Sequence, residues 1–147
     1  MRGFVTFCFT LGAVATSAAA QGSRPMDRWD REVSDQLRRA GQALRDQGFR
    51  PRPEPLTGSL NHGETEQLWI GLREGGVYAL VAVCDSACTD MDLRLLDDAS
   101  HEVAVAIEPG PPVLRITAGR DGKYRLRVVM AACGHSPCRY GVGVFQK

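Results

Sequence analysis

Two different hydrophobic periods divide the chain. From Met26 to Phe49 apolar residues recur every three or four positions, which is the spacing of one helix face. The members of this stripe are Met26, Trp29, Val33, Leu37, Ala40 and Leu44. Pro25 suits a first helical turn and Gly48 suits a helix end. The pattern predicts an amphipathic helix within residues 21–49, docked on its own domain or, as the less favoured alternative, on a partner protein.

Beyond a proline-rich segment, residues 50–55, the period becomes two. This segment cannot continue a helix, and it predicts a short extended linker. In the strand that follows, Leu68 and Ile70 alternate with outward residues such as Trp69. The stretch from Val77 to Cys84 is apolar on both phases, which predicts a central strand covered on both faces.

The remaining apolar runs are short and separated by turn signals. Tyr124, Leu126, Val128 and Met130 share the inward phase of one strand. Asp121-Gly122 predicts a hairpin, and Gly141 and Gly143 predict a flat strand face that another element approaches closely. Seven or eight short strands without a second helix predict a mainly β domain over residues 56–147. The expected fold is an antiparallel β-sandwich or jelly roll.

The first twenty residues have the pattern of a signal peptide. A positive charge at Arg2 precedes an apolar run, and Ala18-x-Ala20 supplies the small residues that a signal peptidase requires. The apolar run is shorter than the roughly 20 residues that span a bilayer. We therefore expect cleavage after residue 20 and a periplasmic location, with an extracellular one as the alternative.

Composition narrows the possible partners and the redox state. The chain has 18 basic and 17 acidic residues, so nothing indicates nucleic-acid binding or insertion in a membrane after cleavage. Behind a signal peptide, four remaining cysteines predict two disulfides rather than a zinc site. The cysteines are Cys84, Cys88, Cys133 and Cys138. Cys84–Cys88 with Cys133–Cys138 is favoured because each pair flanks an apparent hairpin turn, and the crossed pairings stay open.

Acidic residues follow the first cysteine pair. Asp90 and Asp92 share one face of a strand, and Asp85 lies in the preceding turn. Three carboxylates can contribute to a calcium site, which needs six to eight oxygen ligands. The alternative, which we favour, is that these aspartates accept backbone N–H bonds and cap the turn. No cofactor other than calcium is indicated.

Partner binding is the other candidate chemistry. The residues proposed for it are Met26, Trp29, Val33, Leu37, Leu44 and Trp69. For Trp69 we favour packing against the helical stripe, with an exposed aromatic in a ligand-binding surface as the alternative. The sequence contains no G-x-S-x-G or H-E-x-x-H motif and no phosphate-binding glycine loop, so no enzymatic activity is expected.

Several short motifs occur in a familiar order. They are G-x-L at Gly58 and Leu60, G-E at Gly63 and Glu64, a turn at Gly75 and Gly76, D-x-D-L at Asp90, Asp92 and Leu93, and G-x-Y-x-L-x-V at Gly122, Tyr124, Leu126 and Val128. Residues 56–147 thus resemble the bacterial pre-peptidase C-terminal domain. The resemblance implies a secreted jelly roll without catalytic machinery, and some relatives bind proteins, sugars or calcium. This chain differs in having no peptidase domain and in carrying cysteine pairs.

These observations lead to one main functional hypothesis and two alternatives. The main one is an exported, non-enzymatic accessory or binding module that contacts an envelope or secreted protein, or a glycan. The first alternative is a small secreted hydrolase whose site is built from scattered loop residues. The second is an inhibitor that blocks an exported enzyme with its disulfide-bonded loops.

Overall fold

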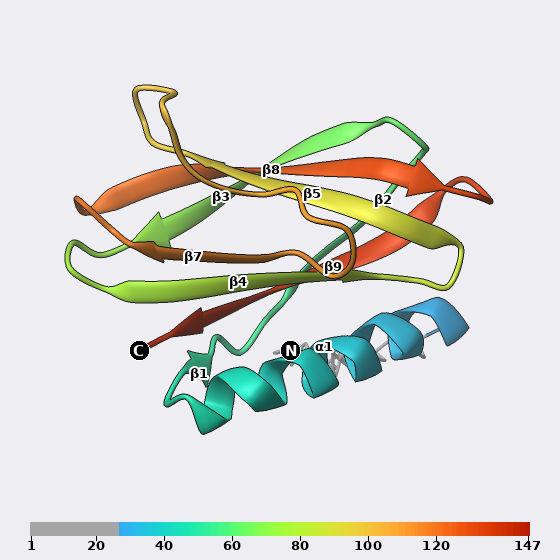
Figure 1. The fold of residues 1–147 in the computed structure, drawn as a ribbon, viewed down its shortest axis with the longest axis horizontal. Coiled ribbons are helices and arrows are strands. Elements are labelled where there is room, and N and C mark those ends of the chain that lie inside the picture. Colours follow the sequence, from blue (N-terminus) through green and yellow to red (C-terminus); the bar gives the residue numbers. More distant parts are fainter. Residues whose placement is uncertain (1–26) are drawn as a thin grey trace, which may run out of the picture.

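The computed structural model describes residues 27–147, which form one helix and nine strands (Figure 1). The predicted signal peptide, residues 1–20, and Met26 lie outside the described residues. The elements are α1 (Arg28–Asp46), β1 (Arg50–Pro51), β2 (Leu56–Leu60), β3 (Thr65–Leu72), β4 (Val77–Cys84), β5 (Cys88–Leu96), β6 (Glu102–Ala106), β7 (Val113–Thr117), β8 (Gly122–Cys133) and β9 (Cys138–Gln146). Within residues 27–147 no helix has the length and apolar character needed to cross a bilayer.

The strands form two antiparallel sheets packed face to face, which confirms the predicted β-sandwich. One sheet has the order β1-β9-β4-β7, with β2 also pairing with β9. Helix α1 lies along the outer face of this sheet (Figure 1), which we call the helix-covered sheet. The other sheet has the order β3-β8-β5-β6, and we call it the open sheet.

Strands that follow one another in sequence mostly lie in opposite sheets. Among the strands of residues 27–147, only β5 and β6 are sequence neighbours that also pair. The hairpin predicted at Asp121-Gly122 is therefore wrong, because β7 pairs with β4 whereas β8 pairs with β3 and β5. Gly122 has a φ of 143°, a conformation that suits glycine, but the turn it serves crosses from one sheet to the other.

The inward faces of both sheets supply the core. Its buried members include Ile70, Leu72, Tyr78, Leu80, Met91, Leu93, Leu95, Leu114, Tyr124, Leu126, Val128, Met130, Tyr140, Val142 and Val144. The inward phase predicted for β8 is confirmed. Burial and a hydrogen bond to Glu66 raise the pKa of the Tyr140 phenol well above its usual value, so this core tyrosine stays neutral.

A second apolar cluster joins the helix to the outer face of the helix-covered sheet. Val33, Leu37 and Leu44 are buried against Ala79, Val81, Val83 and Phe145. Strand β4 is therefore covered on both faces, as its unbroken apolar run predicts. The helix begins where the Asp27 side chain accepts a hydrogen bond of 2.8 Å from the N–H of Asp30.

Helix and sheet approach closely because a glycine on each of them lies against a side chain of the other. A Cβ atom on Gly141 would lie 2.6 Å from Cγ1 of Val33 and 3.0 Å from Cδ1 of Leu37. On the helix, a Cβ on Gly41 would lie 2.6 Å from Cζ of Phe145. The flat face predicted for β9 is thus occupied by α1.

Two features of this arrangement differ from expectation. Trp69 does not contact the helix, because β3 belongs to the open sheet and α1 covers the other one. The indole lies on the outer face and is 59 % exposed, so the predicted packing of Trp69 on the helical stripe is wrong. Within the segment predicted as a linker, Arg50 and Pro51 form β1 by pairing with the end of β9.

A small polar cluster closes the end of the sandwich where β5 turns into β6. The buried carboxylate of Asp97 accepts hydrogen bonds from the N–H of His101 (2.9 Å) and from the Arg120 guanidinium (2.8 Å). The hydrogen bond from the His101 backbone is the main cause that lowers the pKa of Asp97, with smaller contributions from the His101 and Arg120 side chains.

We predict that substitution Gly141→Ala lowers the free energy of unfolding by about 1–3 kcal/mol, because the added methyl group overpacks the helix contact. Gly71→Ala is the matched control, since a Cβ on this strand glycine meets open space. Chemical denaturation followed by circular dichroism measures both. Equal stability of the two variants would show that the close approach of α1 to β9 is not a constraint.

We predict that Asp97 makes stability depend on acidity. Its pKa is lower in the folded protein than the value of about 3.9 of an unfolded chain, so its contribution is complete above that value and is lost as pH falls through the folded pKa. The difference in unfolding free energy between the native protein and Asp97→Asn should persist at pH 5 and shrink below pH 4. A difference that stays constant down to pH 2 contradicts this.

Candidate functional site

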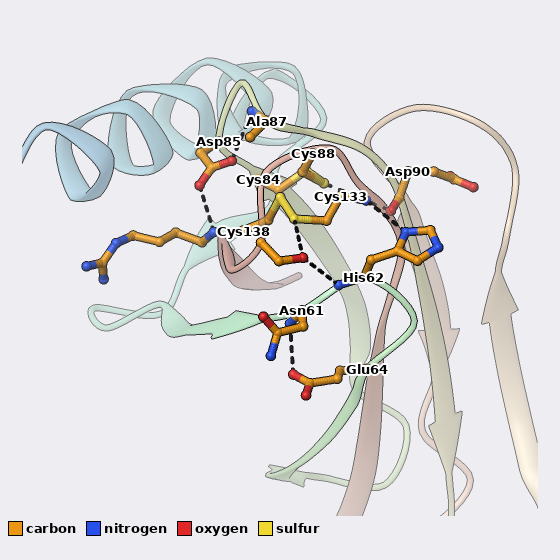
Figure 2. The surroundings of a disulfide bond; sticks show 12 residues. Asn61, His62, Glu64, Cys84, Asp85, Ala87, Cys88, Asp90, Cys133 and Cys138 are labelled. Carbon is orange, nitrogen blue, oxygen red and sulfur yellow. Dashed lines mark hydrogen bonds between the residues drawn. A yellow bond between two sulfur atoms is a disulfide. The ribbon is translucent and has the colours of Figure 1, made fainter.

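Both disulfides lie at the same end of the sandwich and bridge turns that cross between the sheets. Cys84 ends β4 and Cys88 begins β5, whereas Cys133 ends β8 and Cys138 begins β9. The pairing favoured by the sequence is the pairing in the structure. Its supposed reason is wrong, because neither pair flanks a hairpin; each one ties the helix-covered sheet to the open sheet (Figure 2).

Asp85 is buried in the turn bridged by Cys84–Cys88 and stabilises it. Its carboxylate is 4 % exposed and accepts hydrogen bonds from the N–H of Arg139 (2.7 Å) and of Ala87 (3.1 Å). The carbonyl of Ala87 in turn accepts a hydrogen bond of 2.8 Å from the N–H of Gly134 in the second turn. The two disulfide-bonded turns are thereby connected to each other (Figure 2).

A third turn, residues 61–64 between β2 and β3, is fastened to the same cluster. Nδ1 of His62 accepts a hydrogen bond of 3.3 Å from the N–H of Cys133, and the N–H of His62 donates to Oγ of Ser136 at 3.1 Å (Figure 2). The Glu64 carboxylate accepts a hydrogen bond of 2.8 Å from the N–H of Asn61, and hydrogen bonding to Asn61 lowers the pKa of Glu64. We call residues 61–64, 85–87 and 134–137 the stapled end.

The tips of the stapled end face solvent even though their bases are fixed. Gly134, His135, Ser136 and Pro137 are all exposed, as is Ser86. A rigid base under an exposed tip is the geometry of a preorganised binding loop, because little conformational entropy remains to be lost on association.

A cavity of about 230 Å³ opens beside the Cys84–Cys88 turn. Its lining combines apolar and polar residues: Ala82, Val83, Cys84, Cys88, Met91, Gly110, Pro111 and Pro112 with Gln36, Asp85, Ser86, Thr89 and Asp90. The amide of Gln36 donates a hydrogen bond of 2.7 Å to the carbonyl of Cys84, so helix α1 forms one wall.

The structure does not assemble the predicted calcium ligands. The Asp85 carboxylate is engaged by backbone N–H groups, which is the alternative role foreseen for it. Asp90 and Asp92 lie on β5, where burial is the main cause that raises the pKa of Asp92 and the charge of Asp90 adds to it. Residues 27–147 contain no group of three or more His, Cys, Asp or Glu side chains able to hold a metal ion.

A hydrolase would need a contact between a nucleophile and a base, and the described residues contain none. Within residues 27–147, no hydroxyl or thiol is hydrogen-bonded to a histidine ring. Nδ1 of His62 is occupied by the Cys133 N–H, and Nδ1 of His101 lies 3.4 Å from Asp97. Ser136 contacts the backbone of His62 and the sulfur of Cys133, whereas Ser100 contacts Arg125.

The residues predicted to bind a partner are separated by the fold. Val33, Leu37 and Leu44 belong to the buried contact between α1 and the sheet, so their role is internal packing. Trp29 is half-buried near the start of α1, with the Arg28 guanidinium 4.3 Å from its ring centre. Trp69 lies on the outer face of the opposite sheet.

Two parts of the site have no clear signal in the sequence. The turn at His62 joins the stapled end through residues more than seventy positions away in the chain. The helix joins it through Arg139, whose guanidinium lies 3.0 Å from Asp27 and 3.7 Å from Asp30. The cysteine spacing and the turn-capping role expected for Asp85 were the sequence features that pointed to this end of the molecule.

Comparison with known proteins supports the architecture and nothing finer. No protein-family model and no curated protein sequence matches the chain, so the resemblance to the pre-peptidase C-terminal domain has no support beyond the sandwich itself. The structure is similar to that of PliG from Aeromonas hydrophila, a periplasmic lysozyme inhibitor of g-type lysozyme. The similarity has a TM-score of 0.51 at 14 % sequence identity and covers 69 % of this chain and 90 % of PliG. At this identity it shows a shared fold.

We predict that Asp85→Ala destabilises the stapled end. The substitution leaves the N–H groups of Arg139 and Ala87 without their acceptor, and each unsatisfied buried donor costs about 1–3 kcal/mol. Denaturant unfolding measures the global effect, and amide hydrogen exchange of residues 85–88 and 133–139 locates it. Ser86→Ala is the matched control in the same turn, and a similar loss there contradicts the role of the buried carboxylate.

Proposed function

We propose that this protein is an exported inhibitor that binds an envelope-associated or secreted enzyme through its stapled end, with a lysozyme as the target class. The observation that carries the proposal is the stapled end itself. Three turns, two disulfides and a set of loop-to-loop hydrogen bonds present exposed tips on a fixed base.

The rigidity of the stapled end favours inhibition of an enzyme over a flexible accessory contact. Inhibitors of enzymes bind with little change in backbone shape, and rigidity limits the entropy lost on binding. Here the disulfides restrain both sheet-crossing turns, while His62 and Asp85 restrain the backbone between them. The exposed tip consists only of residues 134–137, a size that suits insertion in a cleft.

Two further observations support the compartment and the target class. Disulfides persist in oxidising compartments, which agrees with the export signal predicted in residues 1–20. The sandwich is shared with a periplasmic inhibitor of g-type lysozyme, and that protein's target is the reason for choosing lysozymes as the first targets. A non-enzymatic role is part of the same proposal.

The test uses oxidised protein comprising residues 21–147 and purified g-type and c-type lysozymes. Lysis of a peptidoglycan suspension reports inhibition, and titration calorimetry reports binding. We expect inhibition of at least one lysozyme with a stoichiometry of one to one. His135→Asp, which places a carboxylate at the tip near the acidic residues of a glycosidase cleft, should weaken inhibition at least tenfold.

Glu74→Ala is the control, because Glu74 is exposed in the β3–β4 turn at the opposite end of the sandwich. It should inhibit like the native protein. Absence of both binding and inhibition with every lysozyme at micromolar concentration would exclude this target class. Equal loss in the two variants would exclude the stapled end as the contact.

A further inference from the structure

The outer face of the open sheet carries a group of donors that the fold leaves incompletely used. We propose that Trp69, Gln67 and Arg127 on this face form a binding site for a carboxylate-bearing polysaccharide. The site lies on the side of the sandwich away from helix α1, and it does not depend on the function proposed for the stapled end.

Arg127 is the centre of the site. It is half-buried, and its Nε is buried with no hydrogen-bond partner among residues 27–147. Its cross-strand neighbours are Gln67 on β3 and Arg94 on β5. A like charge directly opposite is unfavourable in a sheet, and Glu102 pairs with Arg94 rather than with Arg127, so a negative group bound beside Arg127 would be stabilising.

The carboxylates of the same face do not neutralise Arg127. Glu102 forms its ion pair with Arg94, at 2.9 Å. Asp90 and Asp92 lie further along β5 on the same phase as Arg94, and among the described residues neither forms an ion pair with Arg127. A guanidinium with free donors binds a planar carboxylate through two parallel hydrogen bonds.

Trp69 supplies an apolar surface beside this cation. It pairs with Arg125 across the strands, and the Arg125 guanidinium lies 5.7 Å from its ring centre. Arg127 is its diagonal neighbour, at a distance of about 7–8 Å between Cα atoms. Arg125 is itself held by a hydrogen bond to Ser100, so the cation stays beside the indole.

The surroundings of Trp69 favour a polysaccharide over a protein. A protein interface has an apolar centre with a polar rim. Here hydrogen-bonding side chains lie beside the exposed indole on the same face: Gln67, Lys123, Arg125 and Arg127, with Thr65 beyond Gln67. All of them can donate. The aliphatic residues Val103 and Val105 lie on β6, beyond Arg94. Many donors around one flat apolar ring suit a ligand rich in oxygen acceptors whose sugar rings offer flat apolar faces.

The test exploits the presence of only two tryptophans in the chain. In a Trp29→Phe background, fluorescence reports Trp69 alone. The probe is polygalacturonate, and the same polymer with its carboxylates methyl-esterified is the neutral comparison. We expect saturable quenching or a blue shift with polygalacturonate in 0.15 M NaCl, and at least tenfold weaker binding of the ester.

Variants locate the site. Arg127→Gln and Gln67→Ala should each weaken binding, Arg127→Gln by tenfold or more, while near-ultraviolet circular dichroism verifies the fold. Arg39→Gln on helix α1 is the matched control and should stay within twofold of the parent. Having two independent variants keeps the test valid if one of them fails to fold.

Three outcomes overturn the proposal: no change in Trp69 fluorescence with polygalacturonate, equal loss in Arg39→Gln and Arg127→Gln, or poly-glutamate binding as tightly as the polysaccharide. The last would indicate an acidic protein partner. Because the assay contains no enzyme, each result is independent of lysozyme inhibition, and Arg127→Gln should inhibit lysozyme as well as the native protein does if both proposals hold.

Discussion

Burial of strand β4 on both of its faces is the constraint on which the rest of the structure depends. One face belongs to the core between the sheets, and the other needs a cover of its own. Helix α1 provides it, but only at a distance that glycine permits, which accounts for Gly141 on the strand and Gly41 on the helix. Once the helix occupies that face, the outer face of the open sheet is the only broad sheet face that residues 27–147 leave uncovered.

The two regions proposed to bind partners, the stapled end and the face around Trp69, are kept rigid in different ways. The stapled end consists of turns, so its shape depends on cross-links and buried hydrogen bonds such as those of Asp85. The face around Trp69 consists of paired strands, so its side chains are positioned mainly by sheet register. Rigidity therefore arises from covalent and polar contacts in one region and from backbone pairing in the other.

The hydrophobic periodicity correctly predicted the structural features that depend on residues close together in the sequence. The helical stripe, the two-sided burial of β4 and the inward phase of β8 all follow from spacing, and the structure confirms them. Which sheet each strand joins depends on contacts between distant residues, and short turns look alike whether they form a hairpin or cross between sheets. That ambiguity explains the errors at Asp121-Gly122 and Trp69. The hydrogen bond between His62 and Cys133 could not be predicted either, because it joins residues far apart in the sequence.

The position of β9 in the helix-covered sheet has a consequence for the order of events in biogenesis. This strand follows all the others in sequence, yet it pairs with β1, β2 and β4 and lies under α1. Until residues 138–146 have been synthesised, the helix has no complete surface and β2 has no neighbour. The helix-covered sheet therefore cannot be completed before residues 138–146 are present, whereas the open sheet contains no part of β9.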